Sequence, residues 1–316
     1  MTSFIIDYGL RRRSELNIQW IESIKLAKPV MLAAWPGMGN VALGAINYLR
    51  RKLDMKQFAQ IDTKAFYAPD GVTVDDGIGK LLPPPKSIFY FRCDPDMVIL
   101  ENEVQFGGKA GMELAREILN FARNLEVARI LTAAAFPIPA SYQEPVKLFG
   151  VANMKSGLNL LTRYRIKIME DGSISGLNGL LLGYAQELGI ESICILATMP
   201  IYATGFPNPR AWKALVEIFS QILNLRVDLR KLDSMIKRTD DKMEQIETRL
   251  QEMLGIKEKP GTGDEQISQF VLNKIERLFQ EAKTSREKAL ELKRELDRWG
   301  LFEMYEDRFL DLFKKD

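Results

Sequence analysis

A glycine turn near the start of the sequence has a composition that anion-binding loops share. Gly37, Gly39 and Asn40 lie between a strand-like apolar run and a helix-like run. Glycine lets a backbone approach a ligand closely, and the first amides of a helix lack intrahelical partners. No GK[ST] follows, and the third glycine of a dinucleotide fingerprint is missing. Two interpretations stay open: an anion-binding turn, or a tight strand-to-helix turn that needs glycine for its geometry.

A second polar loop and an aromatic loop offer further pocket-forming residues. Gly176, Asn178 and Gly179 precede an apolar helix-like run, and Tyr202 lies in a segment rich in proline and aromatic residues. Ser175 or Asn178 could cap the helix, because short polar side chains accept the free amides of a first turn. The same groups could instead face a pocket. The Tyr202 segment suits a pocket wall or a packed subunit interface.

Two carboxylates follow a predicted strand. Glu101 and Glu103 come directly after the apolar run Met97–Leu100. The carboxyl edge of a parallel sheet is where α/β proteins usually bind ligands, and paired acids serve as acid and base or hold a divalent ion. Strand alternation places both side chains on one face, and we expect that face to be open to water.

Missing and balanced residue types exclude several classes of function. There are no histidines, which rules out Ser-His-Asp or Cys-His catalysis and a His-ligated metal. Cys93 and Cys194 stand alone, so we expect reduced thiols rather than a metal clamp. We expect no metal and no cofactor. With 44 basic and 42 acidic residues, the chain has no charge excess that would attract nucleic acid or membrane.

The amino-terminal residues indicate where the protein acts. MTSFIIDYGLRRR lacks the order of charged and apolar residues of a signal peptide. No apolar run reaches the roughly 18 residues that a membrane span requires. We therefore expect a cytoplasmic protein.

Strand-like and helix-like runs alternate through the first two thirds of the chain. Short apolar runs predict buried strands at Pro29–Trp35, Ser87–Arg92, Met97–Leu100, Arg129–Ala135 and Ser192–Thr198. Amphipathic periodicity predicts helices at Asn40–Leu53, Lys109–Leu125, Met154–Thr162 and Leu177–Leu188. This alternation predicts an α/β domain over residues 1–215, with a mainly parallel sheet sandwiched by helices.

The last hundred residues have a different pattern. Charged residues become about twice as dense after Leu225, and apolar residues recur in steps of three and four. We predict helices over about 210–254 and 265–299 that pair as an antiparallel coiled-coil hairpin within a region 216–316. A short amphipathic helix would follow at the carboxyl end. The candidate partner-contact residues of these helices are Leu225, Leu229, Leu232, Ile236, Met243, Ile246, Leu250, Phe309 and Phe313.

Three segments resemble the proteasome assembly chaperone family, of the second-chaperone type and its archaeal and bacterial branch. They are PGMGNVA, DGSISGLNGLLLGYA and ATMPIYATGFPNPRAWKAL, and the resemblance spans roughly residues 15–222. It implies a phosphorylase/hydrolase-like α/β fold, a homo-oligomer of three or more copies, and binding of proteasome α-subunits without catalysis. Gly37, Gly39 and Asn40 match the family's first glycine turn, and Gly176, Asn178 and Gly179 match its second. Archaeal relatives dock through a penultimate tyrosine, which this chain lacks.

Two functional hypotheses follow. The first is a non-catalytic assembly chaperone or scaffold with protein partners, which the absent histidines and the heptads favour. The second is an enzyme of the phosphorylase, hydrolase or ATP-dependent carboxylate-amine ligase type, with its site at the carboxyl edge of the sheet. Its residues would come from the glycine turns and from Glu101 and Glu103.

Overall fold

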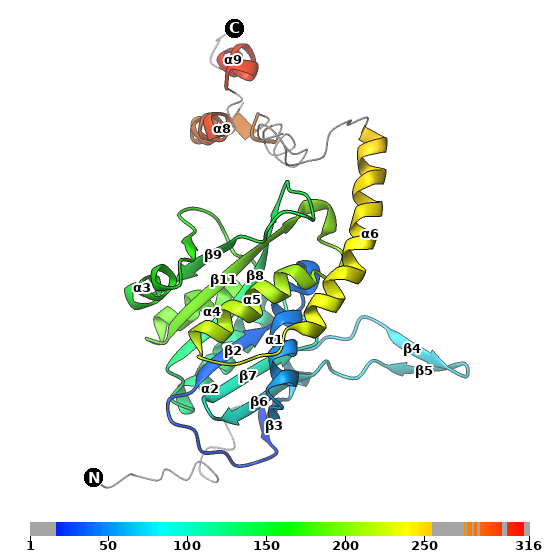
Figure 1. Ribbon diagram of the computed structural model, residues 1–316, viewed down its shortest axis with the longest axis vertical. Coiled ribbons are helices and arrows are strands. Elements are labelled where there is room, and N and C mark those ends of the chain that lie inside the picture. The colour runs from blue at the N-terminus through cyan, green and yellow to red at the C-terminus, as the bar shows by residue number, and fades with distance from the viewer. Residues whose placement is uncertain are drawn as a thin grey trace. The chain divides into compact units, whose positions relative to one another are not determined.

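The chain forms two compact units in the computed structural model (Figure 1). The structure describes residues 17–254, 275, 277–279, 281–282, 285–298 and 302–312. The first unit comprises Met1–Ile138 and Pro145–Gln245, and the second comprises Pro139–Glu144 and Ile246–Asp316. The first unit thus extends some thirty residues past the expected boundary at 215. No helix among the described residues is both long enough and apolar enough to span a membrane.

Nine of the described strands form one mixed sheet in the first unit. Their order is β1-β3-β6-β7-β2-β8-β11-β9-β10. The strands are β1 (Ile18–Trp20), β2 (Val30–Ala34), β3 (Lys56–Ile61), β6 (Ser87–Cys93), β7 (Asp96–Asn102), β8 (Arg129–Ile138), β9 (Leu148–Ala152), β10 (Lys167–Ile168) and β11 (Glu191–Pro200). The central strands β7, β2, β8 and β11 run parallel, whereas β6, β3 and β1 continue the sheet antiparallel. On the other side β9 is antiparallel to β11 and parallel to β10.

Helices cover both faces of this sheet. The helices of the first unit are α1 (Val41–Lys52), α2 (Gly108–Asn124), α3 (Lys155–Arg163), α4 (Leu177–Glu187), α5 (Pro209–Ile222) and most of α6 (Arg230–Leu254), with short turns η1 (Met38–Asn40), η2 (Thr63–Ala65) and η3 (Ile201–Ala203). Helices α2 and α4 pack on the face presented by Met31, Ala33, Val98 and Leu100. Helices α1 and α5 pack on the opposite face. Both faces are therefore buried, which explains the continuous apolar runs of the central strands.

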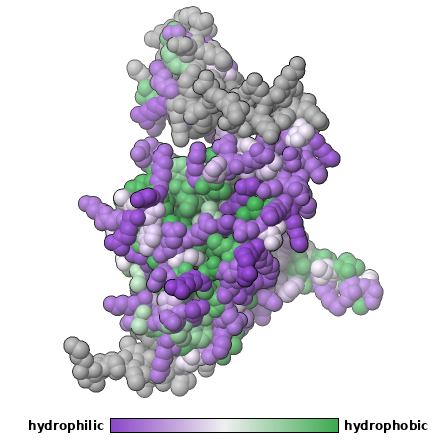
Figure 2. Space-filling view, viewed as in Figure 1, coloured by the Kyte–Doolittle hydropathy of each residue, from purple (hydrophilic) through white to green (hydrophobic). Residues whose placement is uncertain are grey.

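The β4–β5 hairpin is built differently from the sheet. Strands β4 (Val72–Asp75) and β5 (Ile78–Leu81) pair with each other alone and extend away from the sheet (Figure 1). Register places Val72 opposite Leu81 and Val74 opposite Gly79, so one face of the hairpin is apolar. The other face carries Thr73, Ile78 and Lys80, whose ammonium lies 3.8 Å from the Asp75 carboxylate. Every residue of both strands is exposed, and Figure 2 shows hydrophobic residues along this arm.

A break separates α5 from α6, and the predicted continuous helix over 210–254 is wrong. Helix α5 ends at Ile222, and Asn224 adopts the left-handed conformation with φ of 52°. The Leu225 amide donates to Ser220 at 2.8 Å, and the Asn224 amide donates to Gln221 at 3.3 Å. These two bonds form a Schellman motif, which satisfies the last carbonyls and stops the helix. Leu225 and Leu229 therefore lie in the connector, not in a coiled-coil seam.

The amino-terminal half of α6 packs against α5 and α1. Arg210 binds Asp240 through two nitrogens at 2.9 and 2.6 Å, and Lys213 binds Asp233 at 2.8 Å. Leu232 is fully buried and Met243 is 6% exposed. Two of the predicted seam residues are thus already covered in the structure.

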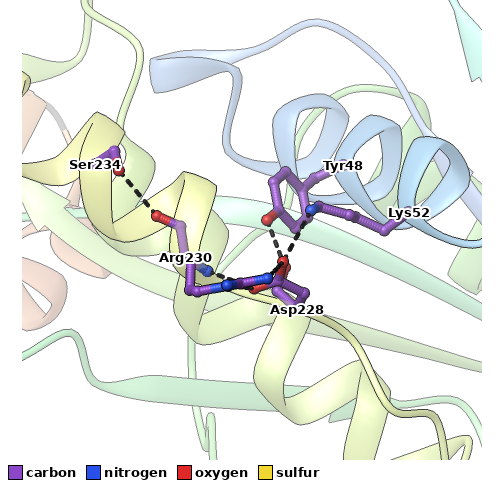
Figure 3. Close-up of polar contacts among 5 residues, drawn as sticks. All are labelled: Tyr48, Lys52, Asp228, Arg230 and Ser234. Carbon is purple, nitrogen blue, oxygen red and sulfur yellow. Dashed lines mark hydrogen bonds and ion pairs between the residues drawn. The ribbon is translucent and has the colours of Figure 1, made fainter.

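Asp228 anchors the start of α6 to α1 (Figure 3). Its backbone oxygen accepts the Tyr48 hydroxyl at 2.6 Å, and its carboxylate contacts Lys52 at 3.4 Å and Arg230 at 3.0 Å. Hydrogen bonds from Arg230 are the main reason that the pKa of Asp228 lies well below its ordinary value. Ser234 then donates to the Arg230 carbonyl at 3.0 Å within the first turns of α6.

The described residues of the second unit form a small helical core. Helices α8 (Arg286–Arg298) and α9 (Phe302–Asp311) pack together, and Phe309 is 8% exposed among the buried Leu278, Phe279 and Leu292. Phe302, Tyr305 and Leu312 pack against the same cluster. Phe313 and much of the predicted 265–299 helix lie outside the described residues. The coiled-coil pairing with α6 remains a prediction.

The tight contact of α1 with α5 yields a first prediction. A Cβ added at Gly44 in α1 would lie 2.1 Å from the Trp212 ring, so Gly44→Ala forces the two helices apart. We expect a loss of about 1–3 kcal/mol in the free energy of unfolding, measured by urea denaturation. Gly183→Ala in α4 is the matched control, because its Cβ meets open space. It should stabilise the protein by about 0.5–1 kcal/mol through helix propensity. Equal effects at both positions would contradict this packing.

The Asp228 contacts predict a dependence on pH. Because the folded-state pKa is lowered, the unfolded chain takes up this proton first as the pH falls. The contribution of Asp228 is fully present above the unfolded-state pKa and disappears as the pH falls through the folded-state pKa. The wild-type free energy of unfolding should therefore decline more steeply than that of Asp228→Asn between about pH 5 and pH 2. Urea denaturation at a series of pH values measures both curves. Parallel curves would show that the ion pairs of Asp228 contribute nothing.

Candidate functional site

The first glycine turn uses its own backbone groups to hold a neighbouring loop. The Gly39 amide donates to Thr204 at 2.8 Å, and the Gly39 carbonyl accepts the Asn208 amide at 3.1 Å. The Trp212 indole N–H also reaches the Gly39 carbonyl, at 3.3 Å. Gly39 adopts φ of 59°, and a Cβ there would lie 2.9 Å from the Met199 side chain. Geometry and packing thus require glycine at position 39.

Gln105 fills the space between the two glycine turns. Its amide donates to the Pro36 carbonyl at 2.6 Å, and its Oε1 accepts the Leu177 amide at 3.2 Å. A Cβ on Gly176 would lie 2.3 Å from that Oε1, and Gly176 itself adopts φ of 76°. The Leu177 amide at the start of α4 is therefore already bonded to a side chain of the protein and is not free to bind an anion. Gln105 could not be predicted from the sequence, because one glutamine in a loop carries no pattern.

The remaining residues of the second loop have structural roles. Asn178 lies inside α4 and is 5% exposed, and its backbone oxygen accepts the Thr132 hydroxyl at 3.2 Å. Neither Asn178 nor Ser175 caps the helix, since Gly176 occupies the cap position without a side-chain bond. A Cβ on Gly179 would lie 2.1 Å from the Ile174 carbonyl, so that glycine permits a tight turn. Tyr202 is half-buried in η3.

A cavity of about 490 Å³ collects three of the predicted site residues. Asn40, Glu101 and Glu103 line it together with parts of α1, β6, α5 and α6. Gly37, Gly39, Gly176, Asn178, Gly179 and Tyr202 do not line this cavity. The structure therefore divides the predicted site into an open cavity on the α1 face and a closed junction around Gln105.

Glu101 lies in a half-buried ion pair, not in water as expected. Its carboxylate accepts from Arg50 at 2.8 Å and from Asn47 at 3.1 Å, both on α1. The Glu101 side chain is 12% exposed, and the Arg50 guanidinium lies over the Tyr90 ring, 4.4 Å from its centre. Strand alternation was predicted correctly, but α1 covers the face in question. Glu103 is exposed and accepts the Lys86 amide at 2.8 Å.

The Glu101 contacts yield a further prediction. Glu101→Ala leaves the Arg50 guanidinium half-buried without its carboxylate, so the free energy of unfolding should fall by about 1–3 kcal/mol. Glu103→Ala, directly after the same strand, is the matched control, and it should change stability by no more than about 0.5 kcal/mol. Urea denaturation of both variants compares them. A loss at Glu103 as large as that at Glu101 would contradict the assigned pairing.

Comparison with known proteins places this arrangement in a group of similar chains. An uncharacterized protein of Methanocaldococcus jannaschii, MJ1210, is 26% identical over 232 residues, which cover 72% of this chain and 87% of that protein. Among solved structures, PbaB of Pyrococcus furiosus, described as an archaeal proteasome activator, superposes with a TM-score of 0.63 at 23% identity. The match covers 73% of this chain and 98% of PbaB.

A second structure from Pyrococcus furiosus has the same fold. PbaA, described as an archaeal homolog of proteasome-assembly chaperone, gives a TM-score of 0.60 at 22% identity and covers 75% of this chain and 94% of PbaA. The model of the PAC2 family matches residues 31–247, which include the central sheet, both glycine turns and the packed half of α6. The expected resemblance is confirmed, and the chain belongs to the PAC2 family.

Proposed function

We propose that this chain is a non-catalytic assembly protein that binds other proteins through the apolar face of its β4–β5 hairpin. The observation that carries the proposal is the exposure of that face. Val72, Val74 and Leu81 are 56%, 69% and 68% exposed. They lie on one side of a two-stranded arm whose other side carries Thr73, the Lys80–Asp75 pair and Ile78.

A hairpin of this kind gains little from its own fold. A two-stranded hairpin is marginally stable by itself in water, and its edges offer unpaired backbone groups to another chain. Exposed apolar side chains gathered on a projecting arm are typical of contact surfaces. Burying one such side chain in a partner contributes about 1.5–3 kcal/mol when burial is complete. The hairpin is therefore suited to bind a groove or a sheet edge of another protein.

Proteasome α-subunits are the proposed partner. Support comes from the PAC2 family membership and from the fold shared with PbaB and PbaA, which are described as a proteasome activator and a homolog of a proteasome-assembly chaperone. We propose further that copies of the chain associate as a homo-oligomer of three or more. Ile236, Ile246 and Leu250 on α6 are half-buried and remain candidate contacts. Leu232, Met243 and Phe309 are withdrawn as candidates, because each is already buried in the structure.

The enzyme hypothesis receives no support from the site geometry. It required the two glycine turns and the two carboxylates to converge on one site. The turns bind Thr204, Asn208 and Gln105, and the Glu101 charge is taken up by Arg50. The chaperone hypothesis needs no such convergence.

The hairpin provides the test of this function. Val74→Lys adds a charge to the apolar face and should weaken binding to purified proteasome α-subunits of the same organism at least tenfold, or about 1.4 kcal/mol. Thr73→Lys adds the same charge to the neighbouring residue on the polar face and should change the Kd less than threefold. Biolayer interferometry measures both Kd values.

Light scattering of the same variants separates partner binding from self-association. Neither substitution should change the thermal unfolding midpoint, since no residue of either strand is buried. Absence of wild-type binding to α-subunits would overturn the partner assignment. Equal loss in the Thr73 and Val74 variants would overturn the role of the apolar face.

A further inference from the structure

The cavity beside α1 has the size and lining of a small-molecule site, which the proposed function does not require. Its volume of about 490 Å³ falls within the range of roughly 300–1,000 Å³ that small-molecule pockets occupy. Leu43, Ile88 and Met235 provide apolar walls, together with the half-buried ring of Trp212. All lining residues belong to the first unit.

Three cations line this cavity without a carboxylate partner. Arg51 of α1, Lys86 before β6 and Lys231 of α6 form no ion pair within the part of the chain that the structure describes. The opposing charges are Glu101, which Arg50 already binds, and the exposed Glu103. An excess of positive charge is left at the cavity, and it favours an anionic occupant.

A buried amide of β7 also belongs to the lining of this cavity. Asn102 lines the cavity and is 2% exposed. Its amide group donates to the Ala34 carbonyl at 2.9 Å, whereas its Oδ1 has no hydrogen-bond partner among the described residues. That oxygen is itself buried, and strand alternation places the Asn102 side chain on the face opposite Glu101 and Glu103, so only the cations and the apolar walls define the anion site. Asn40 also lines the cavity, and its side chain does not cap α1.

We propose that this cavity binds a small organic anion. Its phosphate or carboxylate group lies among Arg51, Lys86 and Lys231, and its body packs on the apolar walls. Guanidinium and ammonium groups are the usual protein partners of both anions. Binding here requires no reaction, so the site is compatible with a non-catalytic protein.

Thermal unfolding with defined anions tests the charged part of the site. Inorganic phosphate or citrate at about ten times its Kd should raise the wild-type midpoint by about 2–5 °C relative to sodium chloride of equal ionic strength. Arg51→Gln with Lys231→Gln should abolish the shift. Lys242→Gln, an exposed cation of α6 outside the cavity, is the matched control and should retain it. A response to phosphate alone or citrate alone identifies which anion the site prefers.

Two results would overturn the site. One is the absence of a shift with either anion, and the other is an equal shift in the wild type and in the Arg51/Lys231 variant, which indicates a general salt effect. Val74→Lys in the hairpin should keep the anion response, so this test is independent of partner binding.

Discussion

A half-buried carboxylate needs a cation, and helix α1 supplies it. Arg50 and Asn47 bind Glu101 at the end of β7, and Gly44 of the same helix admits the Trp212 ring of α5. One turn away, the Tyr48 hydroxyl reaches the carbonyl of Asp228 at the start of α6. A single helix therefore connects the carboxyl end of β7 with α5 and α6. The exposed side of α1 lines the cavity. The Arg50–Glu101 pair holds α1 on the sheet, so it also determines where the candidate binding site lies.

The central strands were predictable because both of their faces are covered. Runs such as Val30–Ala34 contain only apolar residues, and only burial on both faces explains such a pattern. The flanking strands escaped prediction, since Lys56–Ile61 mixes polar and apolar residues and Lys167–Ile168 is too short to show a period. The break after Ile222 escaped for another reason. Its signal is the single left-handed Asn224, within a continuing apolar repeat.

The candidate site was predictable in its parts but not in its arrangement. Sequence alone indicates that Gly39 and Gly176 are turns and that Glu101 and Glu103 share a face. It does not indicate that Gln105 closes the junction, because a hydrogen bond between loops 72 residues apart leaves no local pattern. Nor does it indicate that Asn102, surrounded by apolar and acidic neighbours, ends with one unsatisfied oxygen. Long-range contacts of single polar side chains determine which loops remain open.

The exposed arm between Ala68 and Pro83 has an evolutionary consequence. None of its residues is buried, so the core neither depends on their identity nor restricts it. Substitutions there escape the selection for folding that holds Gly44 or Leu232 in place, and are filtered only by whatever touches the arm. Related chains can therefore diverge in this segment, and acquire different recognition, while keeping one scaffold.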